Sequence, residues 1–188
     1  PVGVLVLFSF QDGGLPVPPF NGPSLKWYGD VLSDRNVTSA LFNSLLVALG
    51  SSAIAVMLGF FAAYGLARYV LPGSVFIRAL LIAPLTVSYL IVGLGLLIVL
   101  TRTGVGLSLI TAGIGHVMIN LPLAFAIIYA SMGAQHENAE RAARDLGATE
   151  AWVLLLVTAP LLSPAIAAAF FLSVTLSWDE FIIAFLLT

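Results

Sequence analysis

The chain has 188 residues, a mean hydropathy of +1.09 and 9% charged residues. This composition excludes an ordinary water-soluble domain, because such a domain needs far more polar surface to cover its core. The net charge of −2 provides no basic surface for nucleic acid, so we expect no nucleic-acid partner. The chain has no cysteine, which excludes disulfides, thiolate metal sites and cysteine nucleophiles.

Four long stretches without an acidic or basic side chain predict membrane spans. They are residues 36–67, 79–101, 103–135 and 151–178. Each is longer than the ~20 residues that an α-helix needs to cross the hydrocarbon core of a bilayer. Because lipid offers the backbone no hydrogen-bond partner, repeated spans of this length form a helical bundle within the bilayer.

The two ends of the chain are also apolar, but they are shorter. Pro1–Phe10 lacks an initiating methionine and a basic region, so it fits the end of a membrane helix better than a signal peptide. Phe181–Thr188 looks like the opening of another helix. We therefore expect an all-α, polytopic transmembrane bundle with four full spans and two partial terminal spans, forming one domain over 1–188 of a longer chain.

Glycine and proline gather between Ser9 and Thr38, where we expect a polar connection without regular structure. Within it, Lys26-Trp27-Tyr28 is typical of an aromatic anchor at the lipid headgroups, and contact with a partner is the alternative. The first complete span is expected at Ser39–Ala67, where many small residues allow neighbouring helices to approach closely.

The next span is expected at Arg78–Leu100, with a kink at Pro84, which has no backbone N–H to donate. Such a helix either lines a transport pathway or simply tolerates its proline. Tyr89 in this span is a candidate pathway residue.

The following span, Gly106–Met132, carries two polar side chains, His116 and Asn120, four residues apart and hence on one helix face. Polar groups in a span mark a pathway or form hydrogen bonds between helices, and we favour the second interpretation. We expect no metal site, because no carboxylate is near in sequence and no second histidine lies on that face.

A polar, helix-forming segment, Glu137–Pro160, stands between two apolar spans and holds four of the nine acidic residues. Read as a helix, its first part pairs Glu137 with Arg141, Glu140 with Arg144 and Arg141 with Asp145, all at a spacing of four. Four of the seven basic residues fall on this side of the membrane, in the direction expected if the segment is cytoplasmic.

The same helix has a shallow apolar stripe of Ala139, Ala142, Ala143 and Leu146, which suits a groove on another protein. An ordinary surface helix between two spans is the alternative. Gly147 is expected to end the helix with a positive φ, and Thr149 to cap the helix that follows. That helix runs through Pro160 into the last complete span.

The spacing in this segment resembles the cytoplasmic-loop signature of binding-protein-dependent ABC importer permeases. The signature is Glu-Ala-Ala, three residues, Gly, nine residues and Ile-x-Leu-Pro. Here it reads Arg141-Ala142-Ala143, Gly147 and Val157-Thr158-Ala159-Pro160, with the spacing intact. Arg141 replaces the glutamate of the signature, and the preceding Glu140 is the candidate substitute for that acid.

Further motifs extend the resemblance over essentially the whole chain, toward the second permease of spermidine/putrescine importers. They are Ser9-Phe10, Lys26-Trp27-Tyr28, Asn43-Ser44-Leu45, Ala67-Arg68-Tyr69, Val92-Gly93-Leu94 and Ser177-Trp178-Asp179-Glu180-Phe181. The resemblance implies a type I, MetI-like permease fold in the bacterial inner membrane. It also implies a second permease subunit, two ATPase subunits that bind the ATP, an external substrate-binding protein and passive alternating access without bond chemistry. The permease itself would need no cofactor.

The resemblance assigns coupling to the ATPase to the segment 134–160. The residues that it selects there are Glu140, Arg141, Ala142, Ala143, Asp145, Gly147 and Pro160. At the other end of the last complete span, Asp179 and Glu180 form a candidate gate for cations, with Trp178 offering its ring to an ammonium group. An exposed turn at the outer surface is the alternative.

Polyamine uptake is the expected function, and two other classes remain open. A permease for another small solute, such as an opine, a phosphonate or ferric iron, would carry the same loop signature. An intramembrane enzyme is disfavoured, because the chain lacks an HExxH motif, cysteine and a pair of aspartates in separate spans.

Overall fold

A computed structural model describes residues 2–12 and 22–188. These residues form helices joined by loops, and within the described ranges the only β-type pairing is an isolated bridge between Gln11 and Pro23. The fold is therefore all-α, as the sequence predicts. The chain divides into two units, 1–44 and 45–188, and the long helix α3 (Arg35–Arg68) contributes to both.

The first unit contains α1 (Val2–Ser9), α2 (Lys26–Ser33) and the start of α3. The Tyr28 hydroxyl is hydrogen-bonded to Ser9 Oγ at 2.7 Å, and Trp27 Nε1 donates to the backbone oxygen of Gln11 at 3.1 Å. The prediction of an irregular connection over Ser9–Thr38 is wrong after Lys26, because the prolines end at Pro23 and a helix-compatible sequence follows. The part at 13–21 lies outside the described residues.

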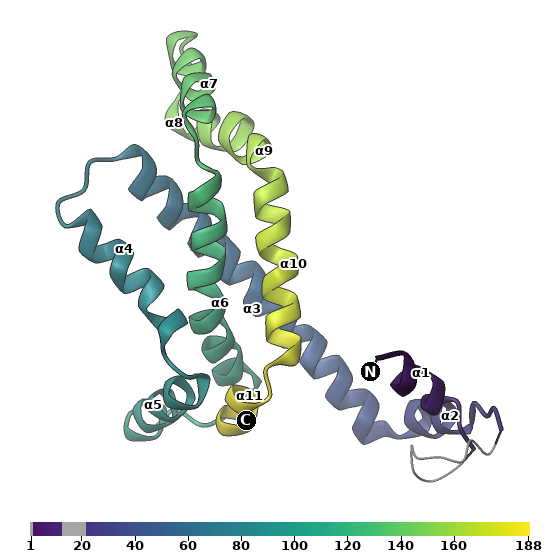
Figure 1. Cartoon of the computed structure of the whole chain (residues 1–188). Helices are drawn as coiled ribbons and strands as arrows, with labels where there is room; N and C mark the ends of the chain where they lie inside the picture. Colours follow the sequence, from purple (N-terminus) through teal and green to yellow (C-terminus); the bar gives the residue numbers. More distant parts are fainter. Residues whose placement is uncertain (1, 13–21) are drawn as a thin grey trace. The chain divides into compact units, whose positions relative to one another are not determined.

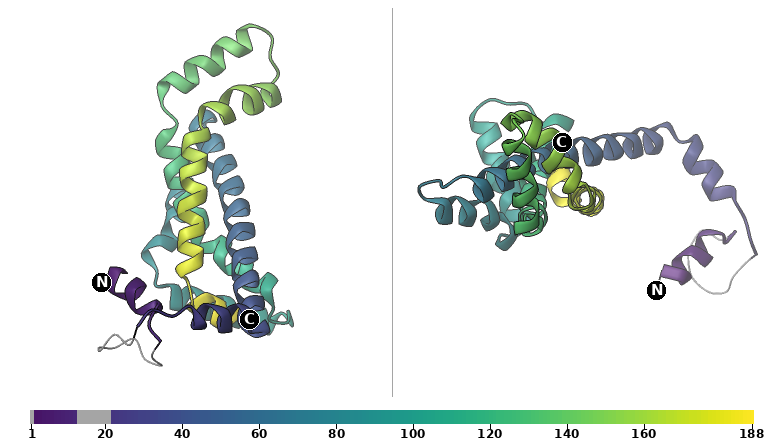
Figure 2. Two further views of the ribbon diagram at one scale, coloured as in Figure 1. Left: turned by 90° about the vertical axis from the view of Figure 1, so that its right-hand side faces the viewer. Right: turned by 90° about the horizontal axis from the view of Figure 1, so that it is seen from above.

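The second unit is a bundle whose elements follow one another through short loops (Figures 1 and 2). After α3 they are α4 (Ser74–Ile82), η1 (Ala83–Thr86), α5 (Tyr89–Arg102), α6 (Leu109–Ser131), α7 (Ala134–Asp145), α8 (Glu150–Val153), the π-helical segment η2 (Leu154–Thr158), α9 (Ala159–Leu161), α10 (Ser163–Asp179) and α11 (Ile182–Leu187). Helices α6 and α10 run side by side in opposite directions, and α11 packs against α5 and α6.

Within the described residues, two helices are long and apolar enough to cross a membrane, α3 and α6. The number rises to four if each of two bent helix pairs forms one span: 74–86 with 89–102, and 150–161 with 163–179. Most large apolar side chains on the outward faces of the helices are exposed, as expected for helices surrounded by lipid. The chain is a membrane protein.

The kink predicted within Arg78–Leu100 is a complete break instead. The two helices of this region meet at 107°, across the 3₁₀ turn at Ala83–Thr86 and an extended Ser88. Pro84 lies within the 3₁₀ turn and removes a backbone donor there, and the chain then changes direction at the extended residues Val87 and Ser88. The predicted kinked helix is therefore two helices, which can still form one bent span.

Two apolar clusters hold the second unit together. The larger one joins α3, α6, α9 and α10 through side chains such as Phe60, Phe125 and Leu162. The smaller one joins α5, α6 and α11. Gly59 allows α3 to cross α6 closely, because a Cβ there would lie 2.9 Å from the backbone nitrogen of Phe125. This agrees with the predicted role of small residues in the first complete span.

Candidate functional site

The signature segment folds as α7, a tight turn and the helix that begins at α8. Gly147 has a φ of +89°, as predicted for the residue that ends the first helix. The Gly147 amide donates to Arg144 O at 2.8 Å and the Ala148 amide to Ala143 O at 3.1 Å, the two bonds of a Schellman motif. A residue with a Cβ is disfavoured at this φ, so glycine fixes the direction in which the chain leaves α7.

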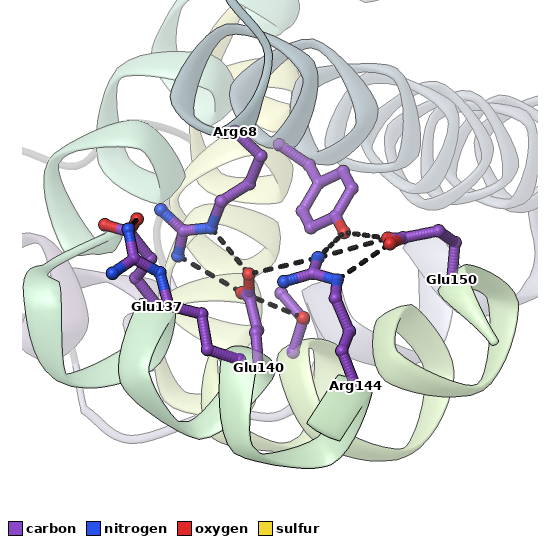
Figure 3. Close-up of polar contacts among 8 residues, drawn as sticks. Arg68, Glu137, Glu140, Arg144 and Glu150 are labelled. Atoms are coloured by element: carbon purple, nitrogen blue, oxygen red, sulfur yellow. Dashed lines mark hydrogen bonds and ion pairs between the residues drawn. The ribbon is translucent and has the colours of Figure 1, made fainter. Parts of the chain in front are cut away.

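The inner face of α7 is anchored by a buried ion pair between Glu140 and Arg68 at the end of α3 (Figure 3). Arg68 donates from Nε to Glu140 Oε2 at 2.6 Å and from Nη2 to Glu140 Oε1 at 3.1 Å, which is a bidentate geometry. Thr158 of η2 donates to Glu140 Oε1 at 3.0 Å. The Glu140 side chain is 0% exposed and that of Arg68 is 8% exposed. One carboxylate therefore links α3, α7 and the start of the last complete span.

A second set of polar contacts lies beside the first, around Arg144 (Figure 3). Arg144 Nε donates to Glu150 Oε1 at 2.7 Å, and Arg144 Nη2 donates to the Tyr64 hydroxyl at 3.3 Å. The hydrogen bond to Glu150 raises the pKa of the Arg144 guanidinium above its ordinary value, so this side chain stays charged. These contacts attach the end of α7 to both α8 and α3.

The local charge pairs of α7 match the prediction only in part. Arg141 pairs with Glu137 on the surface, as predicted. Glu140 and Arg144 approach to 3.9 Å, but each has a closer partner elsewhere. The predicted pair of Arg141 with Asp145 is absent among the ion pairs of the described residues, since Arg141 turns toward Glu137. Thr149 lies at the N-cap position of α8, as predicted, but its side chain makes no capping hydrogen bond.

The outer face of α7 carries the other predicted coupling residues. Arg141, Ala142 and Asp145 are exposed, Ala143 is half-buried, and Leu146 at the end of the helix is 89% exposed. A polar hollow of about 300 Å³ lies where α7 meets the end of α3 and the start of α8. Its walls are formed by Arg68, Tyr69, Glu137, Arg141, Arg144 and Glu150. This face offers charged and apolar groups together, whereas Glu140 points into the chain and cannot touch another protein directly.

Pro160 is exposed in α9, directly after the π-helical segment η2. A proline cannot donate to the carbonyl four residues earlier, so widening of the preceding turn is the local response. This turn carries Thr158 toward Glu140, which connects the last motif residue with the buried ion pair.

Sequence reasoning missed Arg68, Tyr64 and Thr158 as partners, because 72 residues separate Arg68 from Glu140 and no local pattern signals the contact.

At the far end of α10, the predicted pathway residues separate into two groups. Trp178 and Asp179 are exposed and line a hollow of about 610 Å³ between α6 and α10. Glu180 turns back instead, and its Oε1 accepts hydrogen bonds from the amides of Ile182 at 2.9 Å and Ile183 at 3.1 Å. Tyr89 is half-buried and packs against the α5–α6–α11 cluster. Of the four predicted pathway residues, Trp178 and Asp179 line this hollow, and Glu180 and Tyr89 do not.

Comparison with known proteins finds no matching family model. The putrescine transport system permease protein PotI of Escherichia coli K12 is 32% identical over 191 residues, covering 98% of this chain and 68% of PotI. The spermidine/putrescine transport system permease protein PotC of the same strain is 27% identical over 188 residues, covering 100% of this chain and 71% of PotC. The sulfoquinovosyl glycerol transport system permease protein SmoH of Agrobacterium fabrum is 29% identical over 164 residues, covering 87% of this chain and 58% of SmoH.

A bundle of apolar helices with a charged loop at one end is the architecture of a polytopic membrane protein, and a transport permease is one such protein. The match to PotI places the chain within that class: it belongs to the family of transport system permease proteins that includes PotI and PotC. As a permease component of a transport system, it is a non-catalytic transport subunit rather than an enzyme.

Proposed function

We propose that the chain is the transmembrane permease subunit of an ATP-driven importer for polyamines such as spermidine and putrescine. The observation that carries this proposal is the match to PotI and PotC over 98–100% of the chain. Those proteins are named for putrescine and spermidine transport. Alternating access between the two sides of the membrane is the mechanism that the resemblance implies.

Coupling to ATP hydrolysis is proposed for the segment 134–160. Its outer face exposes Arg141, Ala142, Asp145 and Leu146, which can enter a groove on a partner ATPase. Its inner face is tied to α3 through Glu140 and Arg68 and to η2 through Thr158. A displacement of α7 would therefore move the end of α3 and the start of the last complete span together. In this proposal Glu140 holds α7 in place, and the exposed residues meet the ATPase.

The remaining parts of the transporter follow from the family. The proposed complex contains a second permease subunit, two ATPase subunits and an external substrate-binding protein in the bacterial inner membrane. The ATPases bind the ATP, and the permease needs no cofactor. We propose a MetI-like fold with four full spans, in which each bent helix pair counts as one span, and with further helices at both ends.

The solute pathway is proposed to pass the end of α10, where Trp178 and Asp179 share a hollow. A carboxylate next to an indole ring suits a protonated amine, since the ring face attracts a cation and the carboxylate neutralises it. Glu180 serves this region by capping α11, and Tyr89 by packing beneath it.

The test is transport by the complete complex reconstituted in vesicles. ATPase activity and uptake are measured with putrescine, spermidine, an opine, a phosphonate and sulfoquinovosyl glycerol. We expect stimulation by the polyamines, at least 10-fold above the other solutes. Stimulation by one of the other solutes alone would overturn the polyamine assignment and leave the permease class intact.

The second candidate function is transport of another small solute. The match to SmoH over 87% of this chain favours it, because that protein is named for a sulfonated sugar derivative. The solute panel distinguishes the two candidates directly. A sugar sulfonate carries negative charge, so Asp179 would repel it, whereas Asp179 attracts a polyamine.

A further inference from the structure

A group of neutral polar side chains is buried where α10 packs against α6 and α3. Its members are Ser51, Ser52, His116, Asn120, Ser173 and Ser177, and each is at most 5% exposed. His116 Nδ1 is hydrogen-bonded to Ser177 Oγ at 2.6 Å, and Ser177 Oγ lies 3.4 Å from Ser51 Oγ. Ser177 is therefore the point at which the three helices share polar contacts.

Five polar atoms of this group find no hydrogen-bond partner among the described residues. They are Ser52 Oγ, His116 Nε2, both amide atoms of Asn120 and Ser173 Oγ. Asn120 and Ser173 are 0% exposed. Buried polar atoms are nearly always paired with protein or with ordered water, so five unpaired atoms on three adjoining helices require a common explanation.

The helix geometry places Asn120 of α6 and Ser173 of α10 close together. Asn120 lies one turn beyond His116 on α6, and Ser173 lies one turn before Ser177 on α10. Since α6 and α10 are antiparallel neighbours and His116 contacts Ser177, Asn120 and Ser173 lie at the same level of the bundle. One further turn along, Ala124 and Ala169 belong to the apolar cluster, so the polar group ends there.

The chemistry of the group selects a small neutral ligand. It combines hydroxyls, an amide and an imidazole, each able to donate or accept, and it contains no carboxylate. No three His, Cys, Asp or Glu side chains in the described part of the chain lie close enough to hold a metal ion. A buried cation would lack a counter-charge among these groups, which makes its desolvation unfavourable.

We propose that His116, Asn120, Ser173 and Ser52 form an internal binding site for water within this permease, joining α6 to α10 and α3. A buried water makes about three hydrogen bonds to otherwise unpaired polar groups, which matches the unpaired atoms. The site is separate from the hollow beside Trp178 and Asp179 and from the α7 contacts, and it does not depend on which solute is transported.

The test uses the complete transporter in lipid nanodiscs, with ¹⁵N-histidine and ¹³C-methyl isoleucine in this chain. Magnetisation transfer from water is measured by solid-state NMR. The chain has two histidines, and His116→Gln identifies the signal of the buried one. We expect water to reach the His116 ring as rapidly as that of half-exposed His136. Transfer as slow as to the methyl groups of Ile128, buried in the apolar cluster, would overturn the proposal.

Substitutions within the site provide the second measurement. Asn120→Leu removes two hydrogen-bonding atoms at similar volume and should reduce the transfer to His116 by at least half. Thr175→Val removes an exposed hydroxyl from the same helix and should leave the transfer unchanged. Where Asn120→Leu does not assemble, Ser173→Ala, which removes a single oxygen, gives the same comparison. Unchanged transfer in Ser173→Ala and Asn120→Leu alike would overturn the site.

Discussion

The two polar regions of the bundle differ in how completely their groups are paired. Beneath α7, charged side chains form closed contacts, and the buried Glu140 carboxylate accepts three hydrogen bonds. In the α3–α6–α10 interior the groups are neutral, and five of their atoms have no partner among the described residues. A buried charge without a partner costs several kcal/mol, whereas an unpaired neutral group costs about 1–3 kcal/mol. Protein groups alone therefore complete the pairing beneath α7, whereas in our proposal water completes it in the interior.

The difference also suggests different mechanical properties. The α7 contacts fix one arrangement, because two-pronged arginine–carboxylate bonds define both distance and orientation. The interior contacts are shared with a ligand in our proposal, so they define the helix positions less strictly. In the proposed alternating-access mechanism, the fully paired contacts beneath α7 suit the segment that would receive force from the ATPase. The contacts of the α3–α6–α10 interior suit helices that move against one another.

The largest effect is expected from breaking the buried ion pair. Glu140→Ala leaves Arg68 buried without a partner, which should destabilise the protein by about 3–5 kcal/mol. Thermal unfolding of the purified complex, together with the amount of protein in the membrane, measures the effect. Glu137→Ala is the matched control on the same helix, because its exposed pair with Arg141 contributes at most about 0.5 kcal/mol. Equal losses in the two variants would contradict the closed-contact interpretation.

The sequence predicted the parts of this site that depend on local patterns. The helix at 137–146, the positive φ of Gly147 and the surface pair of Arg141 with Glu137 follow from spacing and residue type. The partner of Glu140 could not be predicted, because Arg144 is already within reach on the same helix face and no local pattern indicates Arg68 of α3. The predicted pair of Arg141 with Asp145 is absent because Arg141 pairs with Glu137, four residues earlier, instead.

The fold shows the same limit. Apolar stretches predicted all-α structure and the positions of α3 and α6 within a few residues. Hydropathy does not report the direction of a helix, however, so a run such as 79–101 has the same hydropathy whether its helix is straight or bends by 107° between Thr86 and Tyr89. The unpaired groups around Asn120 were also invisible, because pairing depends on which helices become neighbours.

The next largest effect is expected at the turn after α7. Gly147→Val places a β-branched residue at a φ of +89°, at a cost of about 1–2 kcal/mol, and redirects the chain between α7 and α8. We expect transport to be lost while the protein remains in the membrane. Gly133→Val, at a residue that precedes α7 with a φ of −87°, is the control and should retain transport. Normal uptake with Gly147→Val would exclude a coupling role for this turn.

A smaller effect should separate the two acids at the end of α10. Asp179→Asn removes a negative charge from the hollow beside Trp178, so polyamine uptake should fall about 3- to 10-fold with little change in stability. Glu180→Gln keeps an oxygen for the amides of Ile182 and Ile183, so uptake should change less. Uptake measured against putrescine concentration distinguishes the two. The reverse order would assign the cation-attracting role to Glu180.

The smallest change in stability is expected at Arg141. A substitution there should therefore separate an effect on coupling to the ATPase from an effect on stability. Its side chain is 66% exposed, and among the described residues its one ion pair is with Glu137 on the same helix, so Arg141→Ala should cost at most about 0.5 kcal/mol. If α7 meets the ATPase with this face, the same variant should lower solute-stimulated ATPase activity far more than this stability change explains. Gln135→Ala, also exposed on α7, is the control.

Arg141 stands where the signature has glutamate, so Arg141→Glu tests the charge of the partner surface. Restored or higher activity would mean that the partner surface is basic. A deeper loss would mean that it is acidic. Unchanged coupling in Arg141→Ala and Arg141→Glu would place the ATPase contact elsewhere on the segment.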